Sequence, residues 1–337
     1  MNLKKYVNNE NIKLLIVQCS EYDYTVATLI EGLHEYCKNN KDIIFKCVSD
    51  SNYAKHYKDY TISEQDIEEY VKSCDFIVTT SNRWVRYDLV KKFYNINKVI
   101  FLDGSDSMDF TADPKDFVLY FKRELLKENK ILNVKPFPFA AENRYFFNNN
   151  IDLNNLYNSF EKIWDNKLIK VCCLLSTDNN RNHRYKIKNT IDSKYSGFEW
   201  YVGDPVMGGT KTGIDSIVGK LHNDAYYDLL KNTKISVDAW GAGKLTGRMF
   251  ESLANGCLLF QQPIDDLLYY DELKVDKEIV FYYNEGELIE KIEYYINNEK
   301  ESKDIAYNGF VKLLKSHTTL SRAKYFIDTL KEKKYRR

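Results

Sequence analysis

Short apolar runs alternate with amphipathic segments along this 337-residue chain, and this alternation limits the possible folds more than any other feature. Ile12–Val17 is predicted to be a buried strand, and the apolar residues from Val26 to Cys37 recur at helical spacing. Repeated strand–helix units are typical of a parallel sheet with helices on both faces. The alternation of strand and helix patterns stops at Val134–Asn150, where two prolines and a run of asparagines oppose a regular helix. We therefore place a domain boundary near residue 150.

The same patterns predict the individual elements on either side of this boundary. Strands are expected at Ile12–Val17, Ile43–Val48, Phe76–Thr79, Val99–Leu102, Phe117–Phe121, Ile169–Leu175, Phe198–Val202, Ile235–Asp238, Leu258–Phe260 and Ile279–Tyr282. Helices are expected at Val26–Cys37, after the capping-box pattern Ser63–Asp66, and at Trp84–Tyr94, Leu153–Trp164, 183–193, 224–232, 247–255, 264–272, Glu287–Ile296, 302–315 and 319–333. The expected fold class is α/β, with two parallel-sheet domains in tandem.

Charge and composition exclude several classes of protein. Lys plus Arg and Asp plus Glu both number 49, so the formal net charge is zero, which argues against a protein that coats nucleic acid. No apolar run reaches the roughly 18 residues of a membrane span, and the first residues lack an apolar signal segment. The seven cysteines form no Cys-x-x-Cys pair and the five histidines do not cluster, which argues against a disulfide framework and a structural zinc. We expect a soluble cytoplasmic protein.

Glycine is concentrated in the second domain, where ten of the fourteen glycines lie between Gly197 and Gly256. Glycine is needed where the backbone must approach a ligand closely, so this domain is the predicted ligand-binding domain. The segment most indicative of a ligand-binding site runs from Asp238 to Cys257. In it a strand ends, a glycine loop follows, and a helix begins near Gly247. The free N–H groups and the positive dipole end of such a helix suit a phosphate.

Polar residues near this helix start complete a predicted site for a diphosphate with an attached ribose. Lys244 and Arg248 supply positive charge, and Glu251, one turn into the helix, can accept hydrogen bonds from two sugar hydroxyls. Arg181 and Arg184 belong to the polar loop after the predicted strand Ile169–Leu175, at the start of the predicted helix 183–193, and can pair with phosphate oxygens, although a solvated helix start is the alternative. The motif of a P-loop is absent, and Gly-x-Gly-x-x-Gly does not open the first strand–helix unit.

The stretch Arg248–Cys257 resembles the C-terminal donor-binding domain of GT-B glycosyltransferases, in particular the spore-maturation-protein-like, glycosyltransferase family 1-like group. The resemblance extends over roughly 235–330 and includes Lys277–Tyr282, Ile305–Gly309, His317 with Thr318, and Arg322. It implies two Rossmann-like parallel-sheet domains facing each other across a cleft. Residues 1–150 would bind the acceptor, residues 151–318 the nucleotide-sugar donor, and a helix in 319–337 would cross back to the first domain.

The resemblance implies transfer of a sugar from a nucleotide-diphosphate-sugar to a glycan, a protein or a small molecule. It implies no cofactor and no metal, because basic groups and helix dipoles offset the charge of the leaving diphosphate. Glu251 takes the ribose-binding role of the family, whereas Gly243 stands where many retaining relatives have a second glutamate. The predicted donor-binding residues are Gly241, Lys244, Thr246, Gly247, Arg248, Glu251, Arg181, Arg184 and Gly203.

In the first domain, Asp103 and Asp106 follow the predicted strand Val99–Leu102 and are expected to face the cleft. An inverting transfer needs a base to take the proton of the acceptor hydroxyl, and either aspartate is a candidate, with Asp23 as another. Aspartate also favours turns on its own account, so capping is the alternative role, and a retaining enzyme would need no such base.

Two other functions stay open. The first is a non-catalytic module that binds a nucleotide-sugar with the same fold, which Gly243 favours. The second is phage-type sugar transfer to a nucleic-acid base, against which the neutral charge argues.

Overall fold

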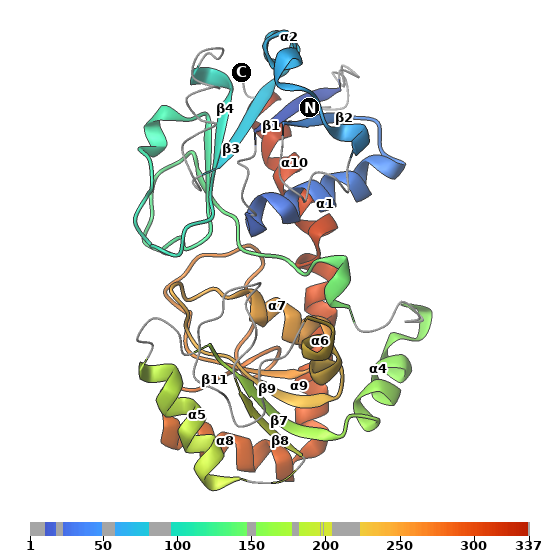
Figure 1. Ribbon diagram of the computed structural model, residues 1–337, viewed down its shortest axis with the longest axis vertical. Helices are drawn as coiled ribbons and strands as arrows, with labels where there is room; N and C mark the ends of the chain where they lie inside the picture. Colours follow the sequence, from blue (N-terminus) through green and yellow to red (C-terminus); the bar gives the residue numbers. More distant parts are fainter. Residues whose placement is uncertain are drawn as a thin grey trace, which may run out of the picture. The chain divides into compact units, whose positions relative to one another are not determined.

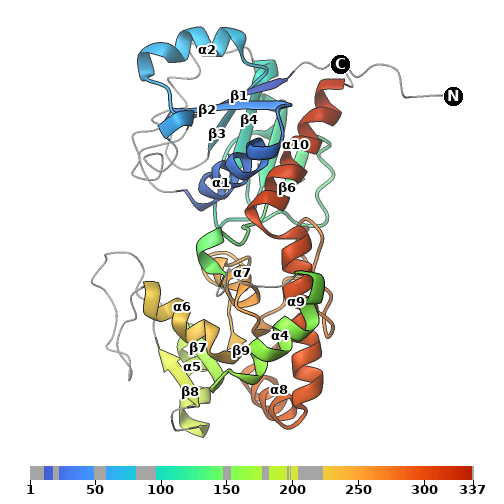
Figure 2. The same ribbon diagram turned by 90° about the vertical axis from the view of Figure 1, so that its right-hand side faces the viewer.

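The structure is a computed structural model whose chain forms two compact units (Figures 1 and 2). It describes residues 11–17, 23–48, 58–80, 96–146, 153–176, 182–195, 197, 199–203 and 223–335. Unit 1 contains Met1–Pro138, Leu268–Tyr270 and Thr319–Arg337, and unit 2 contains Phe139–Leu267 and Asp271–Thr318. The chain first leaves unit 1 after Pro138, whereas the sequence places the boundary near residue 150.

Unit 1 is built on a parallel sheet with the strand order β2-β1-β3-β4-β5-β6. Its strands are β1 (Ile12–Val17), β2 (Ile43–Val48), β3 (Phe76–Thr80), β4 (Val99–Asp103), β5 (Leu119–Lys122) and β6 (Val134–Pro136). Its described helices are α1 (Tyr24–Asn39), α2 (Ile67–Ser73) and α10 (Thr319–Tyr335). The predicted helix Trp84–Tyr94 lies outside the described residues.

Helices α1 and α10 cover the same face of this sheet, and Figure 1 shows them side by side in blue and red. Phe326 of α10 packs on Phe121 of β5 with ring centroids 5.0 Å apart. A Cβ added to Gly32 of α1 would lie 2.1 Å from the carbonyl oxygen of Thr319, so the two backbones meet where only glycine fits. The C-terminal helix is therefore part of the hydrophobic core of unit 1.

Strand β6 is absent from the sequence-based prediction, which treated Val134–Asn150 as irregular. Val134 pairs with Tyr120 of β5, and the strand continues to Pro136. Proline cannot donate to a neighbouring strand, but β6 is the edge strand of the sheet, where proline is tolerated. The prolines thus mark the edge of the sheet and do not exclude a strand.

Unit 2 is built on a second parallel sheet with the order β11-β10-β9-β7-β8. Its strands are β7 (Ile169–Leu174), β8 (Trp200–Gly203), β9 (Thr233–Val237), β10 (Leu258–Gln261) and β11 (Val280–Phe281). Its described helices are α4 (Leu156–Asp165), α5 (Asn182–Lys194), α6 (Asn223–Lys231), α7 (Gly247–Ala254), α8 (Glu285–Asn297) and α9 (Glu299–Ser316). The expected fold class, two parallel-sheet α/β domains, is confirmed.

Helices cover both faces of the second sheet. Helices α4, α5, α8 and α9 pack on the face formed by residues such as Val171 and Phe260, while α6 packs on the opposite face with Cys172. The buried ammonium of Lys167 donates hydrogen bonds to the carbonyls of Lys231 and Asn255, each at 2.8 Å. These carbonyls lie at the C-terminal ends of α6 and α7, so one cation holds together the two helices that carry the site described below.

The predicted helix 264–272 is wrong. Ile264 and Leu267 are buried three residues apart, which imitates helical spacing, but their backbone hydrogen bond closes a single turn. The N–H of Leu268, which itself belongs to unit 1, then donates to the carbonyl of Leu125 at 2.7 Å, and Asp271 has a φ of 51°. Both features end helical geometry, because a left-handed residue cannot continue a right-handed helix.

Within the described residues, no helix is long and apolar enough to cross a membrane.

Candidate functional site

The N-terminus of α7 follows directly from the carboxyl end of β9 through a short loop. Thr246 is the N-cap: its hydroxyl accepts from the N–H of Met249 at 3.3 Å and donates to the buried carboxylate of Asp238. Gly247 and Arg248 are the first helical residues, and their N–H groups have no partner inside the helix. Asp238 thus fixes the cap, and the cap aims two backbone donors and the positive end of the helix dipole out of the loop.

Arg248 adds a charged side chain at this helix end. Its Nε lies 4.0 Å from the Asp238 carboxylate, and its guanidinium lies 5.7 Å from the ring centroid of Tyr226. Burial alone lowers the pKa of Arg248, but Tyr226, Asp238 and Glu251 raise it above its usual value, so the group stays charged. Within the described part of the chain, its buried Nη1 has no hydrogen-bond partner. A buried charged donor without an acceptor is a position that an anion can complete.

Glu251 lies one turn further along α7, beside Arg248. One oxygen, Oε2, accepts from the hydroxyl of Tyr226 at 2.5 Å, while the other, Oε1, is the atom nearest to Gly247, at 3.8 Å from a Cβ added there. Burial and Asp238 raise the pKa of Glu251, whereas Tyr226 and Arg248 act to lower it, with a net rise. The hydrogen bond from Tyr226 therefore orients the carboxylate and supports its charged form.

Arg184 of α5 binds the loop that precedes α7. Its Nε donates to the carbonyl of Trp240 and its Nη2 to that of Ala239, both at 2.7 Å, and its Nη1 reaches the carbonyl of Ser176 at 3.3 Å. A Cβ added to Gly241 would lie 3.2 Å from Nη2, so glycine allows the loop to lie against the guanidinium. The donors of Arg184 thus shape the loop.

Lys244 is also engaged within unit 2. Its ammonium lies 2.5 Å from a carboxylate oxygen of Asp266 and 5.0 Å from the ring centroid of Trp240. The Trp240 indole donates in turn to the carbonyl of Pro263 at 3.0 Å. Lys244 therefore links the glycine loop to the acidic segment after β10, and its charge is balanced there.

The other two predicted donor-binding residues are Gly203 and Arg181. Gly203 ends β8 and is buried, and its carbonyl accepts from the N–H of Leu175 at 3.1 Å. This places Gly203 at the carboxyl edge of the sheet, the edge at which ligands of open α/β sheets bind. Arg181 lies outside the described residues.

Two participants were missed by sequence reasoning. Tyr226 lies on α6, where it looks like one more apolar-face residue among 27 tyrosines, yet it contacts both Arg248 and Glu251. Arg144 lies in a short 3-10 turn before α4, forms an ion pair of 2.8 Å with Glu142, and acts to lower the pKa of Glu251. Neither residue belongs to a local motif, so the sequence carries no signal for its role.

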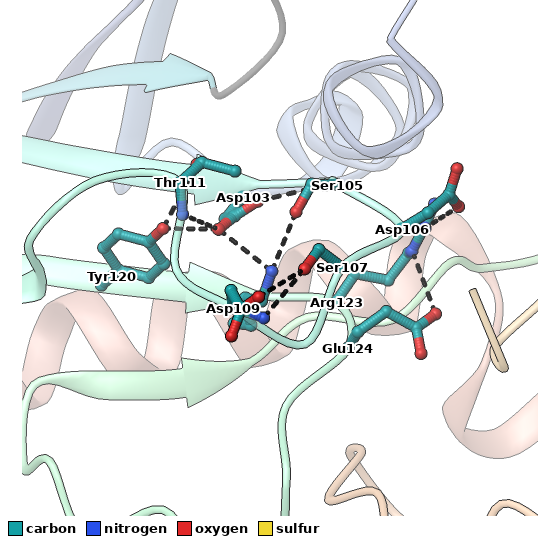
Figure 3. A network of polar contacts seen from close by, with 10 residues as sticks. Asp103, Ser105, Asp106, Ser107, Asp109, Thr111, Tyr120, Arg123 and Glu124 are labelled. Atoms are coloured by element: carbon teal, nitrogen blue, oxygen red, sulfur yellow. Dashed lines mark hydrogen bonds and ion pairs between the residues drawn. The ribbon is translucent and has the colours of Figure 1, made fainter. Parts of the chain in front are cut away.

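In unit 1, Asp103 ends β4 and is the centre of a buried polar network (Figure 3). Its Oδ2 accepts from the ammonium of Lys122 at 3.1 Å, the hydroxyl of Tyr120 at 2.5 Å and the N–H of Thr111 at 3.1 Å, and its Oδ1 accepts from the N–H of Ser105 at 3.1 Å. Burial raises the pKa of Asp103, but the hydrogen bond from Tyr120 and the charge of Lys122 outweigh burial, so the net pKa lies below the usual range.

Asp106 lies in the same loop and has different surroundings. More than half of its side chain is exposed (57%), and one carboxylate oxygen is hydrogen-bonded to the guanidinium of Arg123. Figure 3 shows Arg123 between Asp106 and the buried Glu124, whose oxygen lies 3.5 Å from the Arg123 Nε. Asp106 thus presents an oriented carboxylate to solvent, whereas Asp103 is enclosed.

Asp23, the further candidate base, caps α1. Its Oδ1 accepts from the N–H of Thr25 at 2.9 Å and from that of Val26 at 3.3 Å, and its side chain is buried. These bonds satisfy two of the free N–H groups of the first helical turn. They assign Asp23 a structural role in unit 1.

Comparison with known proteins agrees with this architecture. Residues 199–328 match the family described as glycosyl transferase-like, and a search of the curated proteins finds no match. A glycosyltransferase from Rickettsia africae ESF-5 superposes with a TM-score of 0.64 at 12% identity, over 96% of this chain and 98% of that one. Anabaena HepE in complex with UDP gives 0.59 at 9% identity, over 95% and 100%. An alpha-glucosyltransferase in complex with UDP-glucose and DNA gives 0.53 at 10% identity, over 95% and 99%.

The resemblance found in the sequence is thereby confirmed. The chain has the fold of the GT-B glycosyltransferases, and the glycosyl transferase-like match includes the loop, helix α7 and the strands on both sides of it. Over residues 199–328 the chain is thus similar to a glycosyl transferase-like domain, and the chain as a whole has the GT-B fold.

We expect the two aspartates of unit 1 to differ sharply in their contribution to stability. Asp103→Asn should lower the free energy of unfolding by about 3–5 kcal/mol, because Lys122 would keep a buried charge without its partner. Asp106→Asn should change it by about 1 kcal/mol or less, because its ion pair is exposed on one side. Hydrogen exchange of the β4 and β5 amides measures both effects within unit 1.

The dependence on pH gives a second check. The pKa of Asp103 is lowered in the folded state, so its stabilisation is present above the usual carboxyl pKa and is lost as the pH falls through the folded value. Asp103→Asn should therefore flatten the acid side of the stability curve. Equal losses for the two variants would contradict these assignments.

Proposed function

We propose that this protein transfers a sugar from a nucleotide-diphosphate-sugar to a hydroxyl of a glycan, protein or small-molecule acceptor, without a metal ion. Unit 2 binds the donor and unit 1 activates the acceptor. The observation that carries the proposal is the buried, charged Nη1 of Arg248 at the N-terminus of α7, which has no hydrogen-bond partner among the described residues and lies next to the oriented carboxylate of Glu251.

The donor groups match this arrangement one by one. Diphosphate oxygens accept from the N–H groups of Gly247 and Arg248 and from the guanidinium of Arg248, at the positive end of the helix. Glu251 accepts from the ribose hydroxyls through Oε1, since Oε2 is bound by Tyr226. HepE, which has the same fold, has been solved with UDP and with UDP-glucose, so UDP is the first ligand to test.

The reaction requires charge stabilisation on the donor side and a proton acceptor on the other. The bond between the anomeric carbon and the phosphate oxygen breaks, and the acceptor oxygen forms a bond to that carbon. Arg248 and the helix dipole stabilise the negative charge that develops on the departing diphosphate, a task that a divalent ion performs in other enzymes. We expect transfer to continue in the presence of a chelator.

Asp106 is the better of the two candidate bases. Asp103 uses both carboxylate oxygens on four donors, whereas Asp106 is bound by Arg123 and is otherwise accessible. In an inverting transfer Asp106 takes the acceptor proton, and Arg123 positions the carboxylate.

For Asp106→Asn we expect kcat to fall by about 100-fold or more, with the donor affinity unchanged, because the variant keeps the hydrogen bond to Arg123 but cannot take a proton. Asp109→Asn, an exposed change in the same loop, is the matched control. Full activity of Asp106→Asn, together with a product that retains the donor's anomeric configuration by NMR, would exclude the base role.

Arg248→Ala should weaken the binding of UDP by about 1.5–3 kcal/mol, the usual value of a hydrogen bond to a charged group. Isothermal titration calorimetry measures the change, and Lys186→Ala on the exposed side of α5 is the control. An unchanged dissociation constant would remove Arg248 from the site, and failure of the wild-type protein to bind any nucleoside diphosphate would refute the proposed function.

Tyr226→Phe should shift the acid limit of UDP binding to higher pH, because the lost hydrogen bond acts to lower the pKa of Glu251 and so helps to keep it ionised. The groups that face this carboxylate are Tyr226 on α6, Arg248 on α7, Asp238 after β9, and Arg144 and Tyr145 in the 3-10 turn before α4. Calorimetry across the acid range measures the shift, with Tyr227→Phe on the same helix as the control. Binding of inorganic pyrophosphate, which lacks a ribose, should show no shift; a shift there would place the effect elsewhere.

A further inference from the structure

A strongly exposed apolar tip lies on unit 1, in the loop before the edge strand β6. The side chain of Leu132 is 92% exposed, the highest value among the large apolar residues that the structure describes, and its neighbour Ile131 is 40% exposed. Exposing a leucine to this extent gives up the free energy of its burial, about 1.5–3 kcal/mol. Contact of this tip with an apolar partner would recover that free energy.

Beside this tip lies a hollow of about 350 Å³ that carries positive charge. It is lined by Leu119, Leu132, Asn133, Lys135, Thr329, Glu332 and Lys333. Across the described ranges, no carboxylate forms an ion pair with Lys135 or Lys333, nor with Lys130 next to the tip. By contrast, Lys331 and Lys334 on the same helix pair with Asp42 and Asp75 at 2.7 and 3.0 Å. Lys135 and Lys333 outnumber Glu332, the one carboxylate among the described residues that line the hollow, so its lining has a net positive charge.

The hollow is separate from the catalytic edge of unit 1. Leu119 and Asn133 mark the amino ends of β5 and β6, and Lys333 lies in the last turns of α10, which Figure 2 shows beside β6. Asp103 and Lys122, by contrast, lie at the carboxyl ends of β4 and β5. A partner bound at the hollow would therefore leave the acceptor side of unit 1 accessible.

We infer that this face of unit 1 binds the surface of an anionic lipid bilayer. Leu132 and Ile131 enter the boundary between headgroups and acyl chains, and the lysines contact lipid phosphates. The lining favours a membrane over a nucleic acid, because single strands are held by aromatic stacking and no aromatic side chain lines the hollow, while an aliphatic tip adds nothing to phosphate binding. The inference is independent of the proposed transfer reaction.

The test is co-sedimentation of the full-length protein with vesicles of phosphatidylcholine mixed with phosphatidylglycerol, and with vesicles of phosphatidylcholine alone, in the absence of donor. Binding is expected to the mixed vesicles and to weaken as salt is raised. Lys135→Ala and Lys333→Ala should each weaken it about fivefold, and Leu132→Ser by roughly tenfold. Leu168→Ser is the matched control, since Leu168 is an apolar residue of unit 2 that is 69% exposed.

Several outcomes would overturn the inference. These are no binding to the mixed vesicles, equal binding to both vesicle types, or an equal loss for Leu132→Ser and Leu168→Ser. Retention of a DNA fragment that falls with Lys135→Ala but not with Leu132→Ser, without vesicle binding, would assign the face to nucleic acid instead. All of these substitutions are at surface positions, and thermal unfolding of each variant establishes that it is folded.

Discussion

The buried carboxylate of Asp238 holds the donor side together. Asp238 lies directly after β9, and its carboxylate accepts from the hydroxyl of the cap residue Thr246 and faces the Nε of Arg248. The backbone carbonyl of Asp238 accepts from the hydroxyl of Tyr282 at 2.7 Å. A buried carboxylate is costly unless donors surround it, so this one forces the loop back toward the sheet. The start of α7, the direction of its dipole and the position of Arg248 all follow from this requirement.

In unit 1, a buried carboxylate likewise shapes the loop at the carboxyl end of β4. Asp103 is buried and surrounded by donors, and the group available for chemistry, Asp106, comes three residues later. In both units a buried aspartate at the carboxyl end of a central strand shapes the loop, and the side chain that we propose to be functional follows it. This division of tasks is physically sensible, because a fully hydrogen-bonded carboxylate is rigid but has no lone pair left for a substrate.

Most of the fold could be predicted from the sequence because its signals are local. Buried parallel strands such as Ile12–Val17 are continuous apolar runs, and the structure reproduces that strand with the same ends. The errors arose where tertiary contacts decide. The segment 264–272 has helical spacing, but the N–H of Leu268 donates to the carbonyl of Leu125, and β6 is a strand only because β5 supplies its partner.

In the candidate site, too, local features could be predicted from the sequence and distant contacts could not. The glycine loop and the start of α7 are sequence signals, since the N-cap, the glycines and the charged residues are neighbours along the chain. The partners of the charged residues are distant in the sequence and leave no such signal. Lys244 pairs with Asp266, and Arg184 binds carbonyls more than fifty residues away. The sequence therefore shows which cations are near the loop, but only the fold shows which of them has a donor to spare.

Only some of the cations near the α7 loop have a free donor, and this limits which groups can bind an anion there. Lys244 pairs with Asp266 and Arg184 donates to loop carbonyls, so in the described residues the donors left for an anion at the start of α7 are the Nη1 of Arg248 and the backbone N–H groups of the helix end. A single guanidinium with two backbone donors suits the compact charge of a diphosphate. Gly243 offers no side chain to the sugar, in contrast to a glutamate at that position. Under the proposed function, groups outside the α7 loop would select the sugar, whereas the loop would select the nucleotide diphosphate.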